Sequence, residues 1–152
     1  MKPIKTWIAV ADGAHARILL HANPENRTKT IPGEKYDDHA AFTHELGDDK
    51  PGRTFSSTGS VRHALEPRTD IHEKREEEFL QRLASRLDDA FANGIFDQLI
   101  LVAPPRALGL LRKNLSNHIR NHIVGELGHD LAQRPDHEIA AVVAKSFVGF
   151  GA

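Results

Sequence analysis

Two stretches of the chain are apolar at every position, and each is short enough to be a strand. Trp7–Ala11 and Leu99–Ala103 contain no alternating polar residues, a pattern typical of strands that are covered on both faces. Asp12-Gly13 is a strong turn signal after the first run, so Arg17–His21 is predicted to pair with that run as a hairpin. Trp7, the only tryptophan, is expected in the core rather than on a base-stacking platform.

The stretch after the hairpin carries weaker signals. A short strand is expected around Thr28–Ile31, ended by Pro32-Gly33. No long periodic segment appears from there to Thr69, and so long a connection is partly structured, functional or mobile. Its second half, Gly47 to Thr69, is rich in glycine, proline, serine and threonine. The sequence therefore predicts a flexible loop over residues 47–69.

Helical periodicity is clearest between Ile71 and Ala92. Asp70 and Glu73 have the spacing of a capping box, which predicts where the helix starts. Asn93-Gly94 predicts where it ends. The apolar stripe that should face the core consists of Leu80, Leu83, Leu87 and Phe91.

The second buried strand is followed by further helical signals. Pro104-Pro105 ends that strand, and proline suits the first turn of a helix. Strands that alternate with helices predict an α/β fold, a layered mixed β-sheet flanked by helices. The remaining predicted elements are a helix from Pro105 to about Leu115, a further turn near Ser116–Asn121, a strand over Ile123–His129, and a helix that Asp136 caps and that runs through Ala144.

Composition narrows the classes of function. A length of 152 residues predicts one domain over residues 1–152. The formal net charge of −1 provides no overall attraction to nucleic acid, so anion binding must come from local clusters. The absence of cysteine excludes disulfides, thiolate metal sites and a cysteine nucleophile. Because Asp12 interrupts the first apolar run and no run reaches the roughly 18 residues of a membrane span, we expect a cytoplasmic protein without membrane contact.

One basic segment runs from Gln98 to Gly125 and contains no aspartate or glutamate. Ligands of open α/β sheets gather beyond the carboxyl ends of strands, where helix N-termini carry partial positive charge. An anion such as phosphate is therefore expected near Arg106. The alternative is a solvated helix face that happens to be basic. The basic residues of this segment are Arg106, Arg112, Lys113 and Arg120.

A second basic segment lies in the predicted loop. Glycines and hydroxyls let backbone amides approach a ligand, and arginine binds phosphate with two hydrogen bonds. No Walker or Rossmann glycine pattern is present. The alternative is a surface loop with incidental charges. The candidate anion-binding or RNA-binding residues here are Arg53, Gly59, Arg62, His63 and Arg68.

Catalytic and metal patterns are sparse. Ser56 or Ser57 with His63 and Asp70 supplies the residue types of a hydrolytic triad, but there is no G-x-S-x-G elbow. An enzyme is therefore not favoured, and an enzymatic activity would be that of a hydrolase. His118 and His122 have the spacing of paired zinc ligands but lack an evident third ligand, so structural histidines are preferred. We predict no metal and no cofactor.

Three runs of the sequence resemble the bacterial host-attachment protein family, which is described as required for attachment to host cells. They are GDDKPGRTF (Gly47–Phe55), RHALEPRTD (Arg62–Asp70) and LVAPPRALGLLRKNL (Leu101–Leu115). The resemblance spans nearly the whole chain, and the family is in turn similar to the middle domain of archaeal and eukaryotic class 1 release factors and of Pelota. That similarity implies an α/β sheet with a flexible loop that leads into a long helix.

The resemblance implies a translation-associated factor that binds tRNA or ribosomal RNA through the basic loop and the strand-exit segment. Release factors carry a Gly-Gly-Gln tip on the corresponding loop, whereas this sequence has Gly59-Ser60-Val61 and no Gly-Gly-Gln anywhere. Two alternatives remain. One is a protein-interaction factor that affects attachment to host cells, and the other is an esterase or peptidyl-tRNA hydrolase-like enzyme without that tip.

Overall fold

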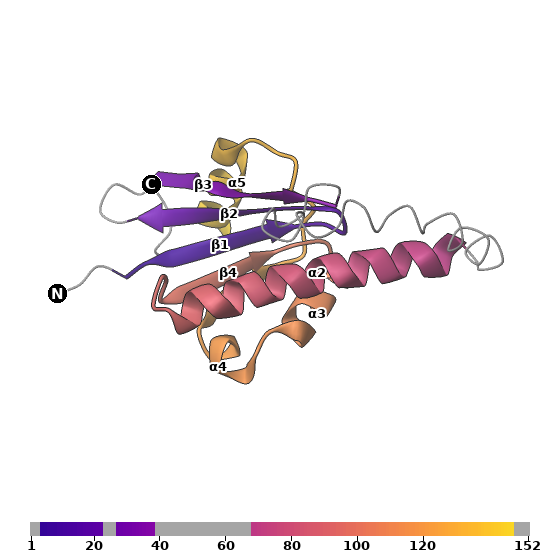
Figure 1. The fold of residues 1–152 in the computed structure, drawn as a ribbon. Helices are drawn as coiled ribbons and strands as arrows, with labels where there is room; N and C mark the ends of the chain where they lie inside the picture. The colour runs from indigo at the N-terminus through magenta and orange to yellow at the C-terminus, as the bar shows by residue number, and fades with distance from the viewer. Residues whose placement is uncertain (1–3, 23–26, 39–67, 148–152) are drawn as a thin grey trace.

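A computed structural model describes residues 4–22, 27–38 and 68–147. These residues form a mixed five-stranded sheet in the order β3-β2-β1-β4-β5 (Figure 1). The strands are β1 (Thr6–Ala11), β2 (His15–Ala22), β3 (Arg27–Asp37), β4 (Gln98–Val102) and β5 (Ile123–Leu127). The helices are α2 (Arg68–Ala92), α3 (Pro105–Asn114), α4 (Asn117–Arg120) and α5 (Asp136–Ser146). The predicted α/β class with a mixed sheet flanked by helices is confirmed.

The two apolar runs form the centre of the sheet. β1 pairs with β4 in parallel, with Ala9 opposite Leu101, and with β2 in an antiparallel hairpin. Every residue of β1 is buried. Successive side chains of a strand point to opposite faces, so Trp7 packs toward α2 and α3 while Ile8 packs toward α5. Two helical layers thus cover the central strands, which explains why their sequences show no polar alternation.

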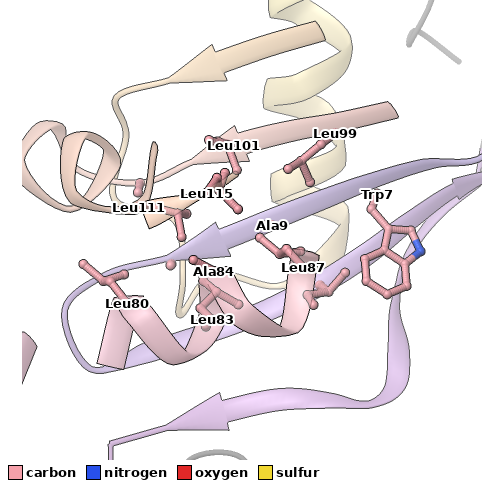
Figure 2. Close-up of a cluster of buried hydrophobic side chains, with 14 of the residues drawn as sticks. Trp7, Ala9, Leu80, Leu83, Ala84, Leu87, Leu99, Leu101, Leu111 and Leu115 are labelled. Carbon is pink, nitrogen blue, oxygen red and sulfur yellow. The ribbon is translucent and has the colours of Figure 1, made fainter. Parts of the chain in front are cut away.

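The apolar stripe of α2 packs on one face of the sheet, as its periodicity predicts. Figure 2 shows Leu80, Leu83 and Leu87 directed toward the central strands, and all three are fully buried. The helix begins at Arg68, so the prediction that Asp70 caps it is wrong. It ends as predicted. Gly94 has φ +72°, and the N–H groups of Gly94 and Ile95 donate to the carbonyls of Phe91 and Ala90, a Schellman motif.

β3 is longer than the sequence predicts. Instead of ending at Pro32-Gly33 it continues to Asp37, and its register against β2 shifts between Arg17 and Leu19. β3 lies at the edge of the described sheet, where a proline that cannot donate a ladder hydrogen bond is tolerated. Gly33 adopts φ +83°, a conformation that favours glycine. The proline and glycine therefore mark an irregularity within the strand and not its end.

Glu34 connects this edge strand to α2. Its side chain is buried and accepts hydrogen bonds from the Tyr36 hydroxyl, at 2.5 Å, and from Arg86 Nε, at 3.1 Å. Arg86 Nη2 also pairs with the second carboxylate oxygen of Glu34. Burial, together with the hydrogen bond and the charge of Glu34, raises the pKa of Tyr36 to about 12.

The stability of the fold is expected to fall between about pH 10 and pH 12. Because the pKa of Tyr36 is about 12 in the folded chain and 10.0 ordinarily, the folded state holds this proton more tightly. The resulting stabilisation is fully present below pH 10 and is lost as the pH rises through 12, and it amounts to about 2–3 kcal/mol. Tyr36 is the only tyrosine, so tyrosinate absorbance reports its pKa directly. Urea unfolding of Tyr36→Phe should lack this component, and a folded-state pKa near 10 would contradict the prediction.

The elements after β4 follow the predicted order. Ser116 caps α4 by accepting from the Ile119 N–H, and β5 spans Ile123–Leu127. The predicted cap of α5 is wrong, because Pro135 holds that position without a side-chain cap. The Asp136 carboxylate instead accepts from the Thr30 N–H at 2.9 Å and the Thr30 hydroxyl at 2.6 Å. Among the described helices, none is long and apolar enough to cross a lipid bilayer.

Candidate functional site

The strands β1, β3, β4 and β5 all end at one edge of the sheet, because β2 alone runs in the opposite direction. This carboxyl edge holds the turn after β1, Asp38 after β3, and the start of α3 after β4. The Asp38 N–H donates to the Ala14 carbonyl at 2.7 Å, which joins two of these segments. Ligands of α/β sheets gather at such an edge, so its polar groups are the first candidates for a site.

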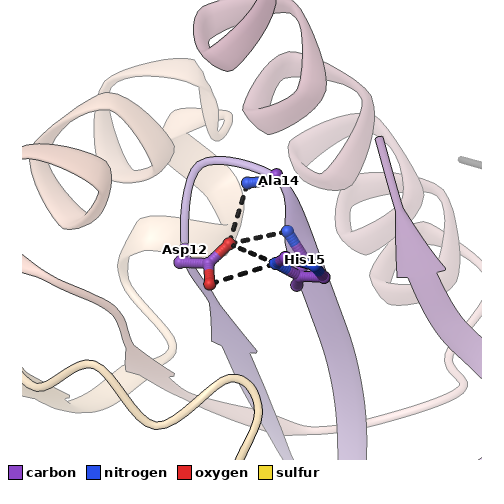
Figure 3. A network of polar contacts seen from close by, with 3 residues as sticks. All are labelled: Asp12, Ala14 and His15. Carbon is purple, nitrogen blue, oxygen red and sulfur yellow. Dashed lines mark hydrogen bonds and ion pairs between the residues drawn. The ribbon is translucent and has the colours of Figure 1, made fainter. Parts of the chain in front are cut away.

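The predicted turn at Asp12-Gly13 is confirmed and uses the Asp12 carboxylate itself. Asp12 Oδ1 accepts from the backbone N–H groups of Ala14, at 2.8 Å, and His15, at 2.7 Å (Figure 3). His15 Nδ1 lies 3.1 Å from Oδ1 and 3.2 Å from Oδ2. A Cβ on Gly13 would lie 2.2 Å from a Glu76 carboxylate oxygen, so glycine allows α2 to approach the turn. Asp12 therefore holds the hairpin in shape.

A small cleft of about 210 Å³ separates this turn from α2. Arg75 and Asp38, which line it from opposite sides, form an ion pair. His72 and Glu76 add further polar groups from α2. In the parts of the chain that the structure describes, no group of three or more histidine, aspartate or glutamate side chains is arranged to hold a metal ion.

Arg106 is an exposed residue in the first turn of α3, close to the carboxyl end of β4. Its Nε donates to Glu76 Oε1 at 3.0 Å, and its side chain is 52% exposed. The segment around Arg106 lacks acidic residues in the sequence, but α2 supplies one in space. The positive charge at the strand exit is therefore compensated in the unliganded chain, although an exposed pair of this kind is worth only about 0–1 kcal/mol.

The Arg120 side chain contacts the last turn of α3, at the end of the helix opposite to Arg106. Arg120 donates from Nε to the Arg112 carbonyl at 3.1 Å and from Nη2 to the Lys113 carbonyl at 2.9 Å. These carbonyls belong to the last turn of α3, which carries partial negative charge. Arg112 Nη1 lies 2.5 Å from a carboxylate oxygen of Glu126 on β5. We call Arg112, Lys113 and Arg120, all exposed, the α3–α4 cluster. In the described part of the chain, the three positive charges of this cluster are accompanied by one paired carboxylate, that of Glu126.

His118 and His122 lie next to this cluster and share a neighbour, as their spacing predicts. The ring centroids of His118 and His122 lie 5.2 and 4.8 Å from that of Phe91 and 5.9 Å from each other. Both imidazoles therefore pack against an aromatic residue of α2. This contact supports the structural interpretation of the two histidines over a metal site.

A comparison with models of known protein families tests the family resemblance that the sequence motifs suggest. The model of a family described as "Protein required for attachment to host cells" matches residues 7–143, from β1 into α5. The chain belongs to this host-attachment family. No curated protein was found to match the chain. The match confirms the family resemblance, whereas the similarity to release factors and Pelota stays a prediction.

Only some of the residues that were predicted to bind anions in this host-attachment protein fall within the described structure. Arg106, Arg112, Lys113 and Arg120 are described, and the last three come together while Arg106 lies at the other end of α3. Arg68 opens α2, but its side chain lies outside the described residues. The residues Arg53, Gly59, Arg62 and His63 also lie outside the described residues, as do Ser56 and Ser57.

One unusual residue of this host-attachment protein, Arg17 on β2, is not among the residues that the sequence motifs single out. Arg17 is only 7% exposed and pairs through Nη1 with Asp136 at 3.3 Å. A sequence signal for it exists, because an arginine stands within the otherwise apolar run Ala16–Leu20. Arginine is almost never buried without a partner, so its position within such a run marks a candidate for function.

Proposed function

We propose that this host-attachment protein is a translation-associated factor that binds tRNA or ribosomal RNA and contacts phosphates through the α3–α4 cluster. The observation that carries the proposal is the convergence of Arg112, Lys113 and Arg120 on the last turn of α3. Their charge exceeds that of Glu126, the one carboxylate that pairs with them among the described residues. Phosphate contacts from lysine and arginine supply most of the sequence-independent affinity for nucleic acid.

Arg106 extends this surface along α3. It precedes Lys113 by seven positions, so the two side chains share one helix face and are separated by about 10 Å of helix rise. Gly109 lies between them, and open space surrounds the position that a Cβ would occupy there. Because an exposed ion pair contributes little, a phosphate can replace Glu76 as the partner of Arg106. RNA would then lie along the face of α3 without obstruction.

The resemblance to the middle domain of release factors and Pelota supports a ribosomal partner. In that similarity the segment before α2 corresponds to the loop that reaches the peptidyl-transfer centre, and here it contains Arg53, Arg62 and His63. Since the sequence has no Gly-Gly-Gln, the proposal is limited to binding and does not include peptidyl-tRNA hydrolysis. Such a role belongs in the cytoplasm.

Salt-dependent binding of purified tRNA and ribosomes tests the proposal. The logarithm of the affinity should fall linearly with the logarithm of the salt concentration, and Lys113→Ala should reduce the slope by about one. Lys145→Ala, which removes the same charge from exposed α5 on the other face of the sheet, is the matched control. Absent binding, an affinity that is independent of salt, or equal losses in the two variants would contradict RNA binding.

A protein partner that affects attachment to host cells is the second candidate function. The description of the family supports it, as does β5, which lies at the edge of the described sheet with Val124 43% exposed. Exposed edge strands are templates for pairing with another chain. Purification from cells at low salt separates the two candidates, because ribosomal particles would favour the first and a stoichiometric protein the second.

A further inference from the structure

Two hollows open on the α5 face of the sheet and meet at Arg17 and Lys35, which line both of them. One has a volume of about 480 Å³ and is also lined by His15, Tyr36 and Gln133. The other, of about 500 Å³, is also lined by Lys29 and His137. Both volumes lie in the range of small-molecule sites, roughly 300–1,000 Å³. The α3–α4 cluster lies on the opposite face, where α2 and α3 cover the sheet (Figure 1).

Arg17 places an unused pair of donors at the junction of these hollows. Its Nη1 faces Asp136, but Nε and Nη2 are buried and have no hydrogen-bond partner among the residues that the structure describes. These two nitrogens form one edge of the planar guanidinium, so their N–H groups point in the same direction and fit two oxygens of one anion. A buried donor that lacks a partner destabilises the fold, and more so when it is charged. An arginine with a purely structural role would therefore destabilise the fold in this position.

Asp136 does not satisfy this arginine by itself. Its carboxylate already accepts two hydrogen bonds from Thr30. Burial alone would raise the pKa of Asp136, but the hydrogen bonds from Thr30 and the charges of Arg17 and Lys35 lower it overall, so the group is ionised. It supplies one negative charge against the two positive charges of Arg17 and Lys35. Asp37 lines the first hollow and Lys29 the second, and they add one charge of each sign.

The N-terminus of α5 adds backbone amides beside the junction, and its first turn also carries Asp136 and Glu138, of which Glu138 pairs with Arg134. The helix has eleven residues, and Pro135 at its N-cap leaves the first turn without a side-chain cap. The ion pair between Arg17 and Asp136, the first residue of α5, brings this turn to the junction of the hollows. Free amides at a helix N-terminus favour an anion.

We propose that the junction of the two hollows binds the phosphoryl group of a small phosphorylated molecule. The free edge of Arg17 takes two phosphoryl oxygens, and Lys35 takes a third. A phosphoryl group offers three oxygens and up to two negative charges to Arg17 and Lys35, whereas a carboxylate offers two oxygens and one charge, which favours phosphate as the ligand. Arg17 Nε and Nη2 are not exposed to solvent, so a lining side chain moves aside on entry. Gln133 is long and exposed and can rotate away.

Titration of the full chain with inorganic phosphate and with glycerol 3-phosphate at constant ionic strength tests this site. The readout is the NMR signal of the backbone N–H of Gln133, a lining residue that is present in every variant. We expect saturable shifts of that signal for both probes and none for acetate. Arg17→Lys keeps the charge but removes the two-nitrogen edge, and Lys35→Ala removes an exposed cation that the fold does not need. Each substitution should weaken binding at least about tenfold, whereas Lys113→Ala, the same charge change on the opposite face, should not.

Three results would overturn the proposal. They are the absence of saturable binding to the wild-type chain, an equal response to acetate, and an equal loss in Lys35→Ala and Lys113→Ala. The site is independent of the proposed RNA contacts. Lys35→Ala should therefore leave tRNA binding unchanged, so either proposal can fail without the other.

Discussion

Replacing Phe96 by alanine is expected to lower the free energy of unfolding by about 3–5 kcal/mol. Phe96 is 1% exposed and stacks on Trp7 with ring centroids 4.6 Å apart and planes 20° apart. It also contacts Phe91 of α2, with centroids 5.3 Å apart. Removing the ring opens a cavity where the end of α2 meets the start of the central strands. Urea denaturation, followed by the fluorescence of the single tryptophan, measures the loss.

The neighbouring residue provides the control. Ile95 is 46% exposed, so Ile95→Ala removes a similar apolar group from a position that is largely in water. Its effect should remain below about 1 kcal/mol. If the two substitutions destabilised the protein equally, or if Phe96→Ala had the smaller effect, the packing of Trp7 on Phe96 would not be what stabilises this corner of the core.

Replacing Glu34 by alanine is expected to cost about 3 kcal/mol, because it leaves a partly buried cation and a buried hydroxyl without their acceptor. Arg86, whose side chain is 31% exposed, and Tyr36 both donate to this carboxylate. The substitution should also lower the pKa of Tyr36 from about 12 toward its ordinary value, since Glu34 contributes to raising it. Urea denaturation and tyrosinate absorbance measure the two effects separately.

Two variants sharpen the test of Glu34. Glu34→Gln keeps an acceptor for Tyr36 but removes the charge, so it should recover part of the lost stability. Glu138→Ala breaks an ion pair with Arg134 in which the two side chains are 44% and 61% exposed, and it should cost less than about 1 kcal/mol. A loss in Glu34→Ala no greater than in Glu138→Ala would show that the buried network contributes nothing beyond a surface pair.

The elements that the sequence predicts well are those specified by local periodicity. The apolar runs of β1 and β4 and the stripe of Leu80, Leu83 and Leu87 correspond to the buried strands and the buried helix face. A residue's face follows from the geometry of its own element, so neighbours within that element are enough to predict it. The end of α2 at Gly94 is also specified locally, because it depends on one residue that tolerates a positive φ.

Two of the predictions that proved wrong concern residues whose partners are remote in the chain. Asp136 has the form of a helix cap, but Thr30, 106 positions away, occupies its carboxylate. Pro32-Gly33 has the form of a strand end, but β3 continues because it pairs with β2 along an edge. In each case a local sequence signal competes with a contact to a remote part of the chain. The arrangement that gives more of the buried polar groups a hydrogen-bond partner is the one adopted.

The candidate sites show the same division between local and tertiary information. The sequence around α3 contains no aspartate or glutamate and therefore predicts a basic surface. Only the folded chain shows that Glu76 pairs with Arg106. It also shows that Arg112, Lys113 and Arg120 lie at the other end of the helix. The hollows at Arg17 have no continuous sequence signature at all, because β2, β3 and α5 each contribute part of them.

By itself, the sequence determined the family, the α/β class, the order of most elements and the faces that those elements bury. The tertiary structure decided which charges are compensated and which donors lack a partner. The physical reason lies in the range of the forces. Hydrophobic periodicity acts through neighbours a few residues apart, whereas the state of a charge depends on every group packed against it, wherever that group stands in the chain.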